Sequence, residues 1–284
     1  MMAPAIVFVV VVALVLAIVF VPSPPAPVGC GATITTDTTL NANVGPCSGN
    51  GLTIGASHVV LDCAGHSISG TGKNGTSIGI NLTGLAGVTV RNCGVTKFGS
   101  GFYLLSTFNS TLVGDRANDD TRGFFLEGVG NDTLGGNTAS NNGGDGLNLT
   151  DFFNSTLSGN TASNNTANGF ELSSSSGVNA LSGSTLTKNT ANNNKQSGFF
   201  LQNYSDDNTL IMNTADSNRI DGIYLSDSNN NTLTGNTANS NGDHGYDVFA
   251  GSGTEGTVNY YAGDECHGNG AGGSWPSGLG SPQP

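Results

Sequence analysis

The chain has 284 residues, of which 44 are glycine, 36% are apolar and only 10% are charged. Glycine is a poor helix former, so this composition excludes a mainly helical protein, and the regular recurrence of apolar residues excludes simple disorder. The formal net charge is −12, with eight basic residues. Nucleic acids and anionic membranes bind clustered lysine and arginine, so neither is expected as a partner.

The first 29 residues have the pattern of an export segment. Residues 1–21 carry no charged side chain, and the proline-rich stretch 22–27 would end any helix that precedes it. The pattern predicts a signal peptide or an N-terminal membrane anchor, followed by a short spacer. No basic residue precedes the apolar run, so both alternatives stay open. In either case the remaining chain is expected to be secreted or held at the cell surface.

Five cysteines fit an oxidising compartment. Cys30 and Cys47 flank a short threonine-rich segment, and we predict that they form a disulfide that closes an N-terminal cap over residues 30–52. Cys63 and Cys93 lie about one repeat apart, so that they either form a second disulfide or only stack.

Nine Asn-x-Ser/Thr sequons permit N-glycosylation without predicting it, because many such tripeptides arise by chance in a chain rich in asparagine and threonine. They begin at Asn74, Asn81, Asn109, Asn131, Asn148, Asn154, Asn164, Asn203 and Asn230.

A repeated unit organises the middle of the chain. Glycine, an apolar residue, any residue and a second apolar residue recur eight times, at intervals of 22 to 24 residues with one step of 29. These units begin at Gly79, Gly101, Gly123, Gly146, Gly169, Gly198, Gly222 and Gly245. A second unit, Thr-Leu-x-x-Asn-Thr-Ala, begins at Thr133, Thr156, Thr185, Thr209 and Thr232.

Each unit alternates apolar and polar residues, which is typical of a short strand with one buried face. The residues between the units are too few for helical crossovers, so the chain must turn tightly and stack on itself. We therefore predict an all-β fold, a single-stranded right-handed parallel β-helix (solenoid) of about nine coils, whose hand follows from the preference of parallel connections. The solenoid is expected over residues 53–250, and a C-terminal cap with a flexible tail over residues 251–284.

The repeat and two N-terminal segments are similar to those of a known family. The segments are Cys30-Gly-Ala-Thr-Ile-Thr with Gly45-Pro-Cys47, and Leu61-Asp-Cys-Ala-Gly-His66. Over roughly residues 30–270 the chain resembles NosD-like right-handed parallel β-helix proteins. This resemblance implies an exported β-helix akin to carbohydrate-binding and sugar-hydrolase proteins, a group that includes enzymes, accessory factors and surface structures.

Equivalent residues of successive coils form columns, and one such column consists of asparagines three residues after the repeat leucine. We predict that these amides hydrogen-bond to one another at an inward turn and have a structural role. They are Asn137, Asn160, Asn189, Asn213 and Asn236.

A second column points outward from the glycine-containing strands and is rich in aromatic residues. Aromatic side chains along one face, with polar neighbours, favour a strip that binds sugar rings or a partner protein. The alternative is that aromatic residues simply suit exposed strand positions. The predicted ligand-binding residues are Tyr103, Phe125, Glu127, Glu171, Phe200, Gln202 and Tyr224.

Candidate catalytic residues lie near the end of the same face. Asp221 and His244 occupy the position before the repeat glycine in adjacent coils, close to Tyr224 and Asp247. An aspartate, a histidine and a tyrosine in contact could transfer protons in a lyase, an epimerase or a hydrolase. The further carboxylates that a hydrolase needs are offered by the pair Asp206-Asp207.

No metal site and no cofactor are predicted. Four scattered histidines and no Cys-x-x-Cys pair argue against zinc. The resemblance brings an association with copper, but the three methionines and four histidines lack the spacing of metal ligands. Calcium bound by the acidic pairs Asp119-Asp120 and Asp206-Asp207 stays an alternative, although the glycine-rich calcium repeat is missing.

These features predict a secreted or cell-surface scaffold, non-catalytic, that binds a polysaccharide or glycan along its aromatic and acidic face. One alternative is a polysaccharide lyase, an epimerase or a glycoside hydrolase that acts on an acidic polysaccharide. The other is a purely structural surface or filament subunit. The sequence leaves the ligand and the oligomeric state open.

Overall fold

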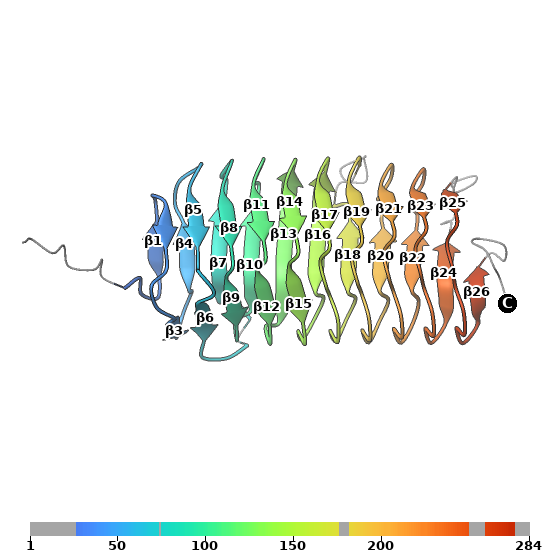
Figure 1. Ribbon diagram of the computed structural model, residues 1–284, viewed down its shortest axis with the longest axis horizontal. Helices are drawn as coiled ribbons and strands as arrows, with labels where there is room; N and C mark the ends of the chain where they lie inside the picture. The colour runs from blue at the N-terminus through green and yellow to red at the C-terminus, as the bar shows by residue number, and fades with distance from the viewer. Residues whose placement is uncertain (1–26, 74, 176–181, 250–258, 276–284) are drawn as a thin grey trace, which may run out of the picture.

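The computed structural model describes residues 27–73, 75–175, 182–249 and 259–275 (Figure 1). The apolar part of the predicted export segment, the sequon at Asn74 and half of the predicted C-terminal cap and tail lie outside these residues. The described part of the chain contains no α-helix, and therefore no helix with the length and apolar character needed to span a membrane.

The chain winds into a stack of coils along one long axis, with the strands of successive coils side by side (Figure 1). Sheet A has eleven strands, in the spatial order β1 (Ala32–Ile34), β4 (Leu52–Ile54), β7 (Ile78–Thr83), β10 (Ser100–Leu105), β13 (Arg122–Gly130), β16 (Leu147–Phe153), β18 (Phe170–Ser173), β20 (Phe199–Gln202), β22 (Ile223–Ser226), β24 (His244–Phe249) and β26 (Gly272–Trp275).

Two further sheets complete each coil. Sheet B has ten strands, in the order β2 (Thr38–Thr39), β5 (Val60–Asp62), β8 (Thr89–Arg91), β11 (Thr111–Val113), β14 (Thr133–Gly135), β17 (Thr156–Ser158), β19 (Thr185–Thr187), β21 (Thr209–Ile211), β23 (Thr232–Thr234) and β25 (Tyr260–Ala262). Sheet C has five strands, in the order β15 (Thr138–Ser140), β12 (Arg116–Asn118), β9 (Gly94–Thr96), β6 (Ser67–Gly70) and β3 (Val44–Cys47). From Thr138 onward, single parallel bridges continue sheet C as far as Glu265.

Strand pairing is parallel throughout the three sheets, and each residue pairs with its equivalent one coil later. In sheet A, Phe124 pairs with Leu147 and Leu126 with Leu149. Eight of the eleven strands of sheet A, from β7 to β24, lie entirely within residues 53–250, and β4 begins one residue before this range. The all-β solenoid expected from the repeat is therefore confirmed.

The interior is filled by the apolar residues of the repeats, which alternate with outward side chains. Leu134, Leu157 and Leu186 of sheet B are fully buried, as are Phe170 and Leu172 of sheet A. A column of alanines fills the third side of the interior, and it consists of Ala117, Ala139, Ala162, Ala191, Ala215 and Ala238.

Glycine recurs at the first position of the repeat for a steric reason. A Cβ atom on Gly198 would lie 2.7 Å from the carbonyl oxygen of Gly222 and 2.8 Å from the methyl group of Ala215. Real Cβ atoms do not approach other atoms so closely, so the tight corner between the alanine column and sheet A admits only glycine at this place.

Two disulfides hold the N-terminal part of the solenoid. Cys30 bonds to Cys47, as the sequence predicts, and Cys63 bonds to Cys93, which resolves the alternative left open for this pair. The second bond joins the ends of β5 and β8, strands that lie next to each other in sheet B. Cys266, the remaining cysteine, is buried at the end of the alanine column.

The column of five asparagines forms a buried ladder, which we call the first ladder. The backbone N–H of Asn160 donates to Oδ1 of Asn189 at 2.9 Å. Its side-chain Nδ2 donates to the carbonyl oxygen of Leu134 and to Oδ1 of Asn189, both at 2.9 Å. Each side-chain amide thus satisfies two backbone groups of the coil before it and donates to the amide oxygen of the next coil.

A second ladder runs along the corner between sheets C and A, and the sequence analysis missed it. Its members lie five residues after those of the first ladder, and they are Asn142, Asn165, Asn194, Asn218 and Asn241, followed by Asn269. Their backbone and side-chain bonds repeat those of the first ladder.

Each ladder begins with an aspartate in place of asparagine. Oδ1 of Asp115 accepts the N–H of Cys93 at 2.9 Å, and Oδ1 of Asp120 accepts the N–H of Phe98 at 2.7 Å. Both carboxylates are fully buried, and their Oδ2 atoms have no hydrogen-bond partner among the described residues. Burial raises the pKa of Asp115 to about 8 and that of Asp120 to about 7.

At the corner between sheets A and B the chain turns through a residue in the left-handed conformation. Asn109, Asn131, Asn154 and Asn230 hold this position with φ between 49° and 58°. Asparagine and glycine tolerate such dihedral angles best. Two residues later the chain enters sheet B at an outward threonine: Thr111, Thr133, Thr156 and Thr232.

Candidate functional site

The predicted outward residues form one continuous column on the outer surface of sheet A. Pairing aligns Tyr103, Phe125, Asn148, Glu171, Phe200, Tyr224 and Asp247, one from each strand from β10 to β24. Gln202 and Glu127 lie two residues further along their strands on the same surface. The structure therefore brings all seven predicted ligand-binding residues to one face.

The four aromatic residues of this column form two stacked pairs. The ring centroids of Tyr103 and Phe125 are 5.5 Å apart, and those of Phe200 and Tyr224 are 4.9 Å apart. All four side chains are half-buried, because each ring covers one face of its neighbour. The guanidinium carbon of Arg122 lies 4.8 Å from the ring centroid of Phe125, so the first pair also contacts a cation.

Two carboxylates lie between the aromatic pairs. Glu171 accepts hydrogen bonds from Nε2 of Gln202 at 2.8 Å and from Nδ2 of Asn168 at 3.4 Å. Burial and the adjacent Asp145 raise the pKa of Glu171 to about 7. Asp145 occupies the same column as Asp221, directly before a repeat glycine, but was not among the candidate residues predicted from the sequence.

A pocket of about 230 Å³ opens beside the second aromatic pair. Its lining combines apolar surface with amide, hydroxyl and carboxylate groups, and consists of Asn168, Gln196, Ser197, Phe200, Ile220, Asp221 and Tyr224. Ile220, at its rim, is 40% exposed. Such a mixture of aromatic walls and a few polar groups is typical of a small-ligand site.

Asp221 also belongs to a group of titratable residues at the corner where the chain enters sheet A. Its Oδ1 accepts the backbone N–H of His244 at 3.0 Å and lies 3.8 Å from Nδ1 of that imidazole. Oδ1 of Asp243 lies 3.2 Å from the same Nδ1. Burial raises the pKa of Asp221 to about 6, with smaller contributions from Asp247 and Asp243.

The remaining candidates do not join this group. Asp206 and Asp207 follow the C-terminal end of β20, whereas Asp221 precedes the N-terminal end of β22. Asp206 accepts the N–H of Asn229, and Asp207 accepts a hydrogen bond from the side chain of Asn230. The predicted contact between Asp221 and His244 is present. Asp206 and Asp207 do not approach it, so they do not supply the further carboxylates that a hydrolase needs.

The acidic pairs considered for calcium do not converge either. Asp120 points inward at the start of the second ladder, while the neighbouring Asp119 lies 3.8 Å from the ammonium group of Lys73 at the surface. Among the described residues, Asp221, Asp243 and His244 are the one group of three whose ligand atoms could meet at a metal ion. The sequence analysis missed Asp243 because its neighbour His244 alone shares a column with Asp221.

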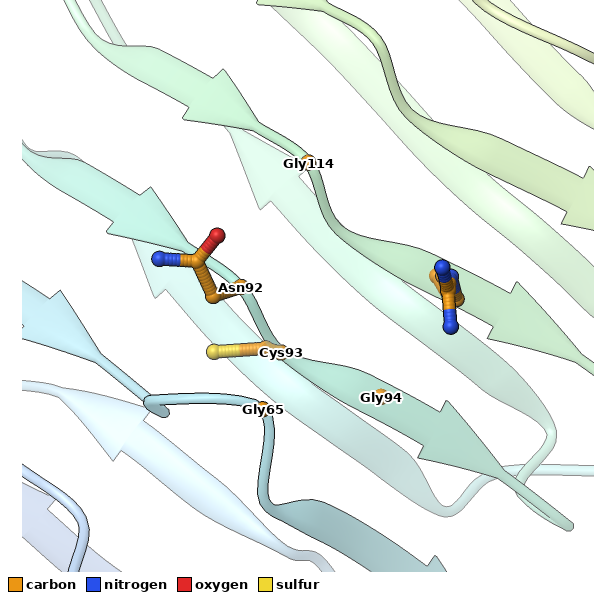
Figure 2. A pocket seen from close by; sticks show the side chains of 6 residues that line it. Gly65, Asn92, Cys93, Gly94 and Gly114 are labelled. Atoms are coloured by element: carbon orange, nitrogen blue, oxygen red, sulfur yellow. The ribbon is translucent and has the colours of Figure 1, made fainter.

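A second hollow lies over the corner between sheets B and C, beside the disulfide of Cys93 (Figure 2). It is lined by Gly65, Asn92, Cys93, Gly94, Gly114 and Arg116. Three of these six residues are glycines, and Arg116 is the one charged residue of the lining. Without an aromatic residue or a carboxylate in its lining, this hollow is a weaker candidate than the face of sheet A.

Comparison with known families identifies the chain. The sequence profile described as "Periplasmic copper-binding protein (NosD)" matches residues 30–188, more than half of the chain. The chain belongs to the NosD family. A profile described as "Right handed beta helix region" matches residues 176–261, so the predicted hand of the solenoid is confirmed as well. No curated protein sequence matches the chain.

Solved structures with the same fold include proteins that act on polysaccharides. The A-module of mannuronan C-5 epimerase AlgE6 from Azotobacter vinelandii is 19% identical with a TM-score of 0.63, over 85% of this chain and 69% of that one. The periplasmic alginate epimerase AlgG is 18% identical with a TM-score of 0.61, over 83% and 61%. The Dettilon tailspike protein is 15% identical with a TM-score of 0.61, over 85% and 57%. At these identities the likeness shows the fold alone.

Copper(I), which prefers thioether and thiolate ligands, does not fit the donor atoms that the described residues of this NosD-family chain bring together. The group around Asp221 offers one imidazole and two carboxylates. Met212, the one methionine within the described residues, is 58% exposed and follows β21, on a different sheet. The oxygen-rich group therefore disagrees with a copper(I) site.

Proposed function

We propose that this protein is an exported, non-catalytic β-helix that binds a neutral polysaccharide along the outer face of sheet A. The observation that carries the proposal is the stacked pair of Phe200 and Tyr224, which lines a pocket together with amide, hydroxyl and carboxylate groups. Aromatic surface packs against the C–H face of a sugar ring, while the polar groups accept and donate hydrogen bonds to its hydroxyls.

The charges of this face favour a neutral ligand over an acidic one. Asp145, Glu171, Asp221 and Asp247 lie on or beside the column, and the whole chain has a net charge of −12. Carboxylates accept hydrogen bonds from sugar hydroxyls, but they repel the carboxylates of a polyuronate.

Export is supported by two observations besides the apolar N-terminal segment. Both disulfides need an oxidising compartment. The family profile and the AlgG structure are also described as periplasmic.

The double variant Phe200→Ala/Tyr224→Ala is expected to weaken binding of the best-bound neutral glycan at least about tenfold. Each aromatic ring contributes on the order of 1 kcal/mol or more, and 1.4 kcal/mol is a factor of ten in affinity. A glycan array identifies the ligand, and isothermal titration calorimetry measures the affinity. Tyr260→Ala, which removes a 56% exposed tyrosine from sheet B, is the matched control and should bind normally. Unchanged binding by the double variant would contradict the proposal.

A lyase or an epimerase is the second candidate, because Asp221 and His244 are in contact and the pKa of Asp221 is raised. Incubation with a panel of neutral and uronic polysaccharides separates the two functions. We expect no turnover. Turnover that disappears in His244→Ala while glycan binding persists would replace the binding function with a catalytic one.

A further inference from the structure

The corner between β22 and β24 gathers one imidazole and two carboxylates at a single point. Asp221 lies two residues before β22, and Asp243 and His244 enter β24 one coil later. Their ligand atoms all lie within 4.8 Å of one another. Equivalent corners elsewhere carry other combinations, such as Arg122 with Thr121 or Ser197 with Gln196.

The distances in this group match the edges of a small coordination polyhedron. Zinc binds imidazole nitrogen and carboxylate oxygen at about 2.0 to 2.2 Å, which gives tetrahedral ligand–ligand edges of roughly 3.4 Å. The two edges from Nδ1 of His244 measure 3.2 Å to Asp243 and 3.8 Å to Asp221. Only small side-chain rotations would bring all three atoms to one ion.

The charges at this corner are not balanced by basic side chains. Within the described residues, neither Asp221 nor Asp243 forms an ion pair with lysine or arginine. The side chain of Asp221 is only 3% exposed, and its Oδ1 lies 3.8 Å from Nδ1 of His244. A nearly buried carboxylate that no lysine or arginine neutralises is stabilised by a bound cation.

We propose that Asp221, Asp243 and His244 form a binding site for a divalent cation of the zinc type, with one coordination position left for an oxygen ligand. The imidazole selects against calcium and magnesium, which prefer all-oxygen sites, and the carboxylates select against copper(I). Asp221 also lines the pocket beside Phe200, so the open position lies near the proposed glycan site. The cation site does not depend on glycan binding.

Titration of the tag-free, chelator-treated protein with zinc chloride tests the site. Isothermal titration calorimetry is expected to show one zinc ion per chain, and cobalt(II) at the same site should give the visible absorption of a four-coordinate ion. Asp243→Asn and His244→Ala should each weaken zinc binding at least tenfold. His267→Ala changes an exposed histidine on another coil and should leave the affinity unchanged.

Asp243 is 47% exposed, so its substitution leaves the fold intact and keeps the test decisive if His244→Ala does not fold. The proposal is overturned if the folded wild-type chain binds no stoichiometric zinc. It is equally overturned if Asp243→Asn binds zinc as tightly as the wild type. If Asp243→Asn loses zinc binding but binds glycan normally, both proposals stand. If Phe200→Ala/Tyr224→Ala loses glycan binding but still binds zinc, the result concerns the glycan site alone.

Discussion

Replacing Asp115 with asparagine is expected to stabilise the protein by several kcal/mol at pH 8. The pKa of Asp115 is about 8 in the folded chain, against an ordinary value of 3.8, so the native state binds this proton more tightly than the unfolded state. Between pH 4 and pH 8 the unfolded chain is ionised at this residue while the native one is protonated. The free energy of unfolding therefore falls by about 1.4 kcal/mol for each pH unit in this window.

The asparagine variant has no proton to lose, and it restores the donor that the rest of the ladder possesses. Nδ2 of Asn137 donates to the carbonyl of Leu112, 25 residues earlier, and the equivalent acceptor for residue 115 is the carbonyl of Val90. Urea denaturation of wild type and variant at pH 5 and pH 8 measures the difference. Asp119→Asn, an exposed neighbour, is the control and should follow the wild type. A variant no more stable than the wild type at pH 8 would refute the explanation.

Asn189→Ala is expected to destabilise the protein by roughly 3 to 6 kcal/mol, because it interrupts the first ladder at its centre. Oδ1 of Asn189 accepts both the backbone N–H and Nδ2 of Asn160 at 2.9 Å. Its own Nδ2 donates to the carbonyl oxygen of Leu157 and to Oδ1 of Asn213, both at 3.0 Å. The alanine variant leaves buried groups of three residues without these bonds, and each unsatisfied group costs about 1 to 3 kcal/mol.

Chemical denaturation at constant pH gives the free energy of unfolding for this variant. Asn193→Gly is the matched control in the same coil, because its exposed position has φ of 59° and glycine accommodates that angle. If the alanine variant unfolds at the same denaturant concentration as the control, the ladder does not contribute to stability as described.

The architecture of this NosD-family chain could be predicted from its sequence because each coil must present the same residue types to the coils on either side. Leucine, alanine and asparagine return at the same place in each coil, since a parallel stack puts equivalent residues in contact. Alignment of the repeats alone placed Tyr103, Phe125, Phe200 and Tyr224 in one column, and the pairing of sheet A does the same. The second ladder has the same signal in the sequence, because an asparagine recurs five residues after each asparagine of the first ladder. It could therefore have been predicted in the same way.

The group of Asp221, Asp243 and His244 was harder to predict from the repeat, because it depends on residues that depart from the repeat. Asp243 lies beside a column rather than in it, and its approach to His244 depends on how the chain turns before β24. The protonation of Asp115 likewise has no signal in the pattern, because aspartate and asparagine differ there only in what surrounds the second side-chain atom.

The left-handed asparagine at the corner between sheets A and B changes how one motif in this chain should be understood. At Asn109, Asn131, Asn154 and Asn230 the backbone requires a residue that tolerates positive φ, and two positions later the strand begins with threonine. Backbone geometry alone thus generates the tripeptide that oligosaccharyltransferases recognise. In this chain four of the nine acceptor tripeptides coincide with this corner, so their presence there is explained by backbone geometry and is not by itself a sign of attached sugars.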